Sequence, residues 1–265
     1  MVEMKFQNLL VQQSIIQLRN SMQQKFQYFI ILITFFNSFE VKSQSLRIEL
    51  IGDSTWLNIL DEIKNVRHIQ VYSLKAVEGE IVSVEYFKTL TIGNFKDITF
   101  FNLKVTNNML KYLNNIRAET FTFNSCFFED STINFNNKYV LFLQVSSSNI
   151  NKISNSIRKM KQLRALTLTS SYITILPRWL LKLKELNLLQ LTGNSIQNLD
   201  KVLKRNNQLK YFIMEECGLK YKDVYRIPKL MTALVHLDLD LSYNDCIRFK
   251  DEYDFSKYKH VRCFN

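Results

Sequence analysis

The sequence predicts an α/β solenoid, in which a curved parallel sheet forms the concave side and short helical or irregular arcs form the convex side. Within residues 163–186, apolar side chains first alternate, as in a strand, and then recur every three or four residues, as in a helix. The same change of period begins again every 23 residues, at Val140, Leu163, Leu186 and Leu209. Neither half of such a unit can bury its apolar side alone, so neighbouring units must stack into one continuous core.

The first 43 residues stand outside this pattern and predict a leader. Lys25 precedes the apolar run Phe29–Phe36, and Val41 and Ser43 occupy positions where a signal peptidase requires small residues. The run is shorter than the ~20 apolar residues of a membrane span. We expect a signal peptide that starts at Met22 and a secreted or periplasmic protein. The alternative is an amphipathic helix that covers the first repeat.

Residues 44–135 repeat the pattern at longer and uneven spacing, so we expect divergent repeats there. Strand positions are occupied by Ile48 and Leu50, Ile69 and Val71, and Phe121 and Phe123. Cys126 follows the last of these pairs at the point where the chain should turn. The stretches 90–98 and 107–116 between them suggest a strand and a helix.

Residues 136–246 follow the pattern closely. "LLQLTGNSIQNL", residues 188–199, resembles the leucine-rich repeat family, whose consensus is L-x-x-L-x-L-x-x-N/C-x-L, with Asn194 at the Asn/Cys position. Neighbouring repeats place Ser148, Ser171 and Cys217 there. This side chain should face inward where the chain leaves the strand and satisfy backbone groups that would otherwise be buried unpaired.

Composition agrees with one elongated domain. The chain has 265 residues, and its hydrophobic content of 46% is sufficient for a continuous core. With two prolines, five glycines and no low-complexity linker, nothing marks a domain boundary.

The four cysteines fall into two groups. Cys126 and Cys217 lie four repeats apart, too far for a disulfide at ~4.8 Å per stacked strand. Cys246 and Cys263 bracket residues 247–265, which we expect to form a C-terminal cap. The family resemblance implies that they bridge and seal the core, whereas their spacing alone allows two free thiols equally well.

Catalytic and metal-binding motifs are lacking in the sequence, so we expect neither an enzyme nor a cofactor. The three histidines fit no H-E-x-x-H pattern, and there is no nucleophile elbow or phosphate-binding glycine loop. "HLDLDL" places His236, Asp238 and Asp240 on one side of a strand. These residues allow a metal site, but we favour a solvated acidic end of the concave face.

The resemblance implies that function lies on the concave sheet, at the outward positions between the leucines. The candidate ligand-binding residues are Phe142, Gln144, Thr167, Leu188, Gln190, Tyr211, Ile213, Glu215, Asp238 and Asp240. Phe142, Ala165, Leu188 and Tyr211 should form one apolar column beside glutamines and threonines, which suits a protein or peptide ligand. The alternative is that Phe142 and Leu188 merely pack against each other across the sheet.

Positive charge should gather on the convex side. The net charge is +11, and Lys159, Lys182 and Arg205 share one repeat position. Lys161 with Lys184, and Arg178 with Lys201, form two further columns of this basic ridge. The sequence therefore predicts an exported, monomeric, non-catalytic module that binds another protein or peptide, without a nucleic-acid ligand or a stable membrane span. The alternative is a structural or adhesive surface protein that binds an anionic polymer or membrane surface through the ridge.

Overall fold

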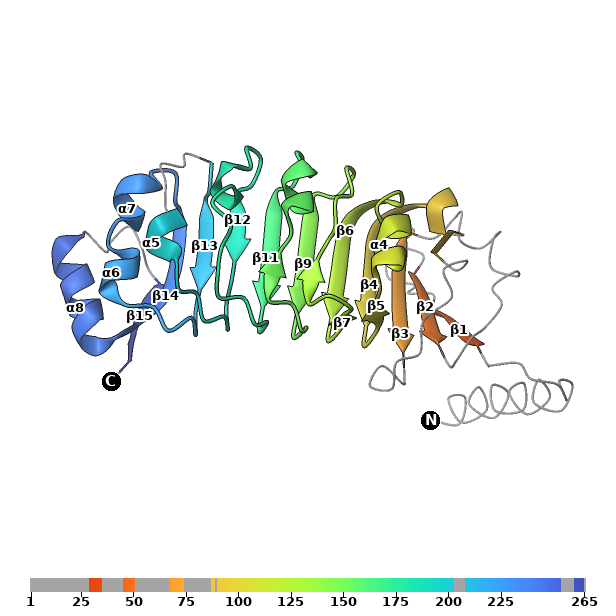
Figure 1. Cartoon of the computed structure of the whole chain (residues 1–265), viewed down its shortest axis with the longest axis horizontal. Helices are drawn as coiled ribbons and strands as arrows, with labels where there is room; N and C mark the ends of the chain where they lie inside the picture. Colours follow the sequence, from red (N-terminus) through yellow and green to blue (C-terminus); the bar gives the residue numbers. More distant parts are fainter. Residues whose placement is uncertain are drawn as a thin grey trace, which may run out of the picture.

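A computed structural model describes residues 29–34, 45–50, 67–73, 87–88, 90–202, 208–253 and 260–264. These residues form an eleven-stranded sheet whose strands follow one another along the longest axis in sequence order (Figure 1). The strands are β1 (Phe29–Thr34), β2 (Ser45–Leu50), β3 (His68–Ser73), β4 (Asn94–Phe101), β6 (Arg117–Asn124), β9 (Phe142–Ser146), β11 (Ala165–Thr169), β12 (Leu188–Gln190), β13 (Tyr211–Met214), β14 (His236–Ser242) and β15 (His260–Phe264). All neighbours pair in parallel except β1, which is antiparallel to β2.

Short helices and small strands connect the members of the sheet. The helical elements are η2 (Leu90–Ile92), α4 (Asn107–Leu113), η3 (Asn155–Lys159), η4 (Leu180–Lys182), α5 (Leu199–Val202), α6 (Tyr221–Val224), α7 (Ile227–Leu230) and α8 (Tyr243–Glu252). Two parallel pairs lie along the connections, β5 (Lys104–Val105) with β7 (Phe127–Phe128) and β8 (Thr132–Ile133) with β10 (Lys152–Ile153). A parallel sheet with short helical arcs is the predicted fold class, which is confirmed.

The repeat is regular over more of the chain than the sequence pattern indicated. One series of residues occupies equivalent, register-matched positions on successive strands: His68, Asp97, Thr120, Phe142, Ala165, Leu188, Tyr211 and His236. From Asp97 onward these positions are 22 to 25 residues apart. The step from His68 to Asp97, at 29 residues, is longer than all of these. The sheet therefore continues unbroken across the predicted boundary near residue 135.

The core changes from phenylalanine to leucine along the solenoid. Phe121 and Phe123 pair in register with Leu143 and Val145, and all four are fully or almost fully buried. Buried rings contact one another through the N-terminal repeats in stacked and edge-to-face pairs, with centroid separations of 5.1 Å to 6.3 Å, and include Phe87, Phe100, Phe128 and Phe135. Aromatic side chains thus fill the volume that leucines fill further along.

The Asn/Cys position faces the core, as predicted. Asn194 is buried, and its amide donates to the carbonyls of Leu168 at 2.8 Å and Leu191 at 2.9 Å while its oxygen accepts the N–H of Ile173. In an earlier repeat, the Ser148 hydroxyl accepts the N–H of Cys126 at 3.1 Å. These bonds satisfy backbone groups that leave the strand and have no ladder partner.

A residue in the left-handed backbone conformation directly precedes the Asn/Cys position in each described repeat from β4 to β13. Ser131 and Gly218 have positive φ elsewhere in the connections, whereas at this position the residues with positive φ are Asn102, Ser125, Ser147, Ser170, Gly193 and Glu216. Their spacing of 22 or 23 residues reproduces the repeat. The turn allows the following side chain to point inward at every step, including Leu103 after Asn102, where no Asn, Ser or Cys marks the position.

The C-terminal tail adds another strand. β14 leads directly into α8, whose first turn is capped by the Ser242 hydroxyl, and β15 then pairs in parallel with β14. Figure 1 shows α6, α7 and α8 gathered at this end of the sheet. Within residues 247–265, expected to be a cap, the described part comprises the rest of α8 and β15, which extends the sheet by one strand.

The predicted leader is described only over β1, which pairs antiparallel with β2. The remainder of residues 1–43 lies outside the described residues. A signal peptide that begins at Met22 therefore stays a prediction.

Candidate functional site

The outward side chains of β4 to β14 form the surface that we call the open face. Its first column holds Asp97, Thr120, Phe142, Ala165, Leu188, Tyr211 and His236. Its second column holds Thr99, Thr122, Gln144, Thr167, Gln190, Ile213 and Asp238. Phe101, Asn124, Ser146 and Thr169 form a third. The residues beneath them, such as Leu143 and Leu166, are buried, so the columns stand on a rigid layer.

The predicted apolar column is present. Phe142 and Tyr211 are 40% and 41% exposed, and the half-buried Ala165 and Leu188 lie between them. At ~4.8 Å per strand, the two aromatic positions are about 14 Å apart. Ala165 lies between Phe142 and Leu188 in register, so these two side chains belong to strands that are not adjacent. The structure thus has two separate exposed aromatic side chains on this face.

The second column carries hydrogen-bonding groups without charge over most of its length. The Gln144 amide lies 3.4 Å from the Ser146 hydroxyl, and the Gln190 amide lies 3.5 Å from the Thr192 hydroxyl. These contacts run along each strand. Each glutamine amide has two donor hydrogens and an acceptor oxygen, so hydrogen-bonding capacity remains on the face.

The acidic end differs from the solvated surface that we expected. The Asp238 side chain is only 16% exposed, with its Oδ2 atom 3.9 Å from Nε2 of His236. Asp240 accepts the backbone N–H of Glu216 at 2.8 Å. The sheet does not end at β14, because β15 pairs with it opposite both aspartates, and Asp238 and Asp240 are half-buried. Glu215 follows β13 directly and completes this end.

Sequence reasoning missed the other end of the open face. Nδ1 of His68 on β3 contacts Oδ2 of Asp97, the first member of the first column, so a histidine–aspartate pair lies at this end of the open face. Thr99, Thr120 and Thr122 extend the polar surface between this pair and Gln144. The longer step between β3 and β4 concealed these neighbours, because residues 29 apart do not fit a 23-residue repeat.

Charge is segregated between the open face and the rest of the chain. None of the residues in the three columns is a lysine or arginine, although the chain has 35 of them against 24 acidic residues. Of the predicted basic ridge, Lys159, Lys161, Arg178, Lys182, Lys184 and Lys201 are exposed. Arg205 lies outside the described residues. A ligand on the open face therefore meets aromatic, amide and hydroxyl groups, with carboxylates at both ends.

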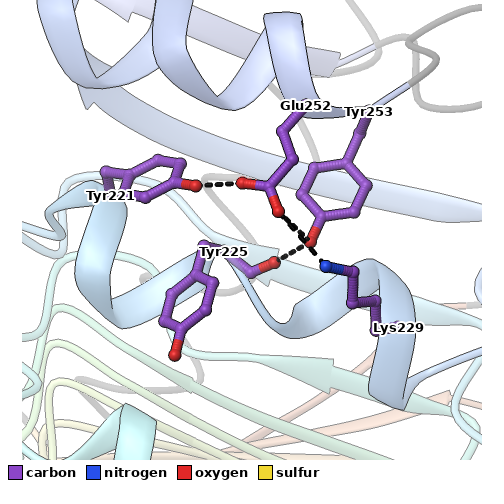
Figure 2. Close-up of polar contacts among 5 residues, drawn as sticks. All are labelled: Tyr221, Tyr225, Lys229, Glu252 and Tyr253. Atoms are coloured by element: carbon purple, nitrogen blue, oxygen red, sulfur yellow. Dashed lines mark hydrogen bonds and ion pairs between the residues drawn. The ribbon is translucent and has the colours of Figure 1, made fainter.

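A polar cluster that we call the C-terminal clasp joins three helices beyond β13. Glu252 of α8 accepts the Tyr221 hydroxyl of α6 and lies 3.2 Å from Nζ of Lys229 in α7 (Figure 2). The Tyr253 hydroxyl donates to the Tyr225 carbonyl. The hydrogen bond from Tyr221 and that from Lys229 lower the pKa of the Glu252 carboxyl. The same bond to the carboxylate raises the pKa of Tyr221. These contacts tie α8 to the last repeat.

Two of the four cysteines are free and buried, Cys126 and Cys217. Burial raises the pKa of the Cys126 thiol to about 12 and that of Cys217 to about 11. Such thiols are protonated and shielded, so they serve as packing groups rather than nucleophiles. The described residues contain no group of three or more His, Cys, Asp or Glu side chains suited to a metal ion. None of their helices is long and apolar enough to span a bilayer.

Comparisons with known proteins concern the fold alone. No family model and no curated protein matches the chain. An internalin from Listeria monocytogenes superposes with a TM-score of 0.48 at 13% identity, over 82% of this chain and 68% of the internalin. The TLR13–ssRNA13 complex gives a TM-score of 0.45 at 14% identity, over 74% of this chain and 36% of the TLR13 chain. The chain thus spans about a third of TLR13. The parallel sheet, the inward Asn/Cys position and the 23-residue period are those of a leucine-rich-repeat solenoid.

Proposed function

We propose that the chain is an exported, non-catalytic binding module that recognises another protein or peptide through the open face. The observation that supports this most is the distribution of side chains on that face. Two exposed aromatic residues, Phe142 and Tyr211, flank an apolar step and lie beside a column of amides and hydroxyls. Aromatic anchors surrounded by uncharged polar groups are the composition of protein-binding hot spots.

The rigidity of the sheet supports the same function. Parallel strands on a buried core present the open face without rearrangement, so most of the ordering cost of binding falls on the partner. The carboxylates at the two ends of the face then favour a partner whose binding segment carries no acidic residues at its ends.

Site-specific photocrosslinking tests the assignment of the face. A crosslinking amino acid at Thr167, in the centre of the open face, should capture a partner from the native environment. The same group at Lys182, on the opposite side, serves as the control. Partners captured from Lys182 but not from Thr167 would contradict the proposal.

Affinity measurements with the captured partner test the anchors. Leu188→Ala and Tyr211→Ala should each weaken binding by about 1–3 kcal/mol, since hot-spot truncations have that magnitude. Tyr172→Ala is the matched control, because Tyr172 is an exposed tyrosine outside the open face. Unfolding curves of all variants establish that the repeats remain intact. Equal losses of affinity in Tyr172→Ala and Tyr211→Ala would contradict the assignment of partner binding to the open face.

Export is part of the proposal and has its own test. If the leader is a signal peptide, N-terminal sequencing of the native protein should begin near Gln44 or Ser45. Recovery of residues 1–21 in the mature protein would exclude it.

We also propose a disulfide between Cys246 and Cys263 in the exported protein. Cys246 is buried on α8, which packs against β15, and Cys263 pairs with Leu241 in the backbone register. Oxidising compartments favour such bridges. Mass spectrometry of unreduced peptides should show residues 246 and 263 joined, and free thiols at both positions in exported material would contradict the bridge.

A further inference from the structure

The positive charge of the chain is concentrated in one acid-free stretch. Residues 131–184, bounded by Asp130 and Glu185, contain nine lysines and arginines and no aspartate or glutamate. The nine are Lys138, Lys152, Arg158, Lys159, Lys161, Arg164, Arg178, Lys182 and Lys184. Since the whole chain has a net charge of +11, this fifth of its length carries most of the excess.

Seven of these cations lie on the connections of two neighbouring repeats. The exposed residues are Lys152, Arg158, Lys159, Lys161, Arg178, Lys182 and Lys184, and we call this set the arc surface. Ile157 and Leu180 are buried beneath it, on the core side of η3 and η4. No member of the set forms an ion pair with a carboxylate among the described residues. Their charge is therefore directed away from both the core and the open face.

Besides Phe142 on the open face, two large apolar side chains are exposed in the same stretch. Tyr172 is 71% exposed and Ile175 is 62% exposed, the former being the most exposed of the large hydrophobic residues described. Both lie on the segment that leads from β11 to the arc. Ile175 occupies the repeat position of Lys152 and comes three residues before Arg178. The backbone N–H of Tyr172 donates to the carbonyl of Ile150, so this segment lies against the preceding repeat, which carries Lys152. Apolar and basic side chains are thus combined on neighbouring repeats.

We propose that the arc surface, with Tyr172 and Ile175, docks on a bilayer that contains anionic lipid. Lysine and arginine side chains are attracted to anionic headgroups, and each adds to the partitioning. The side chains of Tyr172 and Ile175 then lower the free energy of docking by entering the bilayer–water interface, where the tyrosine ring can keep its hydroxyl in the headgroup region. Docking in this way presents the open face away from the bilayer, toward a partner.

The exposed apolar residues favour a bilayer over a hydrated polyanion. A polyanion would use the cations but would offer Tyr172 and Ile175 no apolar environment. A single-stranded nucleic acid would require several aromatic platforms among the cations, and this stretch offers only Tyr172 beside the arc surface. The tryptophan of this stretch, Trp179, is buried, and its Nε1–H donates to Asn155 at 2.6 Å. Trp179 is therefore closed to base stacking.

Vesicle co-sedimentation of the full chain tests the proposal. Vesicles of phosphatidylcholine with phosphatidylserine should bind the protein. Vesicles of phosphatidylcholine alone measure the binding that the apolar run near the N-terminus contributes without anionic lipid. Lys159→Glu/Lys182→Glu should lower partitioning onto anionic vesicles by at least about thirtyfold, since the loss of two cations alone accounts for that factor. Tyr172→Ser/Ile175→Ser should lower it by about tenfold through lost apolar insertion. Lys111→Glu/Lys222→Glu is the matched control, because it makes the same charge change at exposed lysines outside the stretch.

Binding to polyphosphate separates the bilayer from a soluble polyanion. The Tyr172→Ser/Ile175→Ser variant should bind polyphosphate as the parent does while losing affinity for anionic vesicles. Circular dichroism establishes that each variant is folded. The proposal is overturned by any of three results: no preference for anionic vesicles, an equal loss in the control variant, or unchanged vesicle binding after removal of the two apolar side chains. The last result would assign the surface to a soluble polyanion.

Discussion

The carboxylate of Asp240 accepts the backbone N–H of Glu216 at 2.8 Å, in a position where earlier repeats use a backbone carbonyl. The equivalent N–H groups of Asn102, Ser125, Ser147, Ser170 and Gly193 each donate to a carbonyl of the following repeat. β14 instead continues to Ser242 without a left-handed residue at this position. The side chain thus replaces the carbonyl at the last of these turns, which explains why an aspartate is tolerated on an interior strand.

Removing this acceptor should destabilise the C-terminal repeats. We expect Asp240→Leu to cost about 1–3 kcal/mol of unfolding free energy, because the Glu216 N–H loses its partner. Asp240→Asn keeps an acceptor oxygen and should cost less. Urea unfolding measures both, with Asp251→Leu as the control at an exposed carboxylate of α8. Equal stability of Asp240→Leu and the parent would show that water satisfies the N–H.

Backbone strain at the left-handed turns gives a second prediction. Ser147 has a φ of 49° and an exposed side chain, and a non-glycine residue in this region costs about 1–2 kcal/mol. Ser147→Gly should therefore stabilise the protein by about 0.5–1 kcal/mol, after the entropy that glycine adds to the unfolded chain. The converse change is Gly193→Ala, where φ is 71° and a Cβ would lie 3.2 Å from backbone atoms of Ser170. The midpoint of thermal unfolding should rise for Ser147→Gly and fall for Gly193→Ala. A shift in the same direction for both variants would refute the strain argument.

The sequence predicted the leucine half of the solenoid in residue detail because its pattern is unambiguous. Phe142, Ala165, Leu188 and Tyr211 lie in one column because the 23-residue period fixes the register of their strands. The N-terminal half could not be aligned in the same way. There Leu103 occupies the Asn/Cys position, phenylalanines replace leucines, and one repeat is longer. A period search therefore has no consistent residue to follow.

Other features depend on contacts that no local pattern encodes. Asn149 and Asn198 hold neighbouring repeats together, since each side chain both donates to and accepts from the backbone of one residue, Phe128 and Leu176 respectively. Asparagine is common in exposed turns, so its sequence position alone does not indicate this role. β15 was missed because its sequence, HVRCF, follows a stretch without leucine spacing, and only its pairing with β14 reveals it.

The buried thiols predict a loss of stability at alkaline pH. An unfolded cysteine loses its proton near pH 9.0, whereas burial raises the folded pKa values to about 12 for Cys126 and about 11 for Cys217. Above pH 9 the native state therefore binds more protons than the unfolded state, so stability falls as pH rises. The expected slope is about 1.4 kcal/mol per pH unit for each thiol. Urea unfolding of Cys126→Ala/Cys217→Ala between pH 9 and pH 11 should show a shallower decline.

The control for this experiment is Ser171→Ala, a change at the same repeat position without a titrating thiol. It should lower stability by a similar amount at every pH and leave the slope unchanged. A double cysteine variant whose stability declines as steeply as that of the parent would assign the pH dependence to other groups.

The C-terminal clasp predicts a loss of stability in acid. Hydrogen bonds from Tyr221 and then Lys229 lower the pKa of Glu252 below its ordinary value of 4.5. Near that pH the unfolded chain binds more protons than the native state, so the contribution of the clasp is present above pH 4.5 and is lost as pH falls through the lowered pKa. Glu252→Gln should therefore reduce the acid sensitivity of α8 docking. Because Glu252 is well exposed, the effect should be largest at low ionic strength and decrease with added salt.

Limited proteolysis at a series of pH values, with an acid-active protease, measures this docking through cleavage near residues 243–253. The parent should become more susceptible as pH falls below 4.5, whereas Glu252→Gln should be more susceptible at neutral pH and change little on acidification. Asp251→Asn is the matched control, since it removes the adjacent exposed carboxylate and leaves the contacts with Tyr221 and Lys229 in place. If Asp251→Asn shifts the pH profile as much as Glu252→Gln does, general charge on α8 accounts for the acid response, and the hydrogen bonds of the clasp do not.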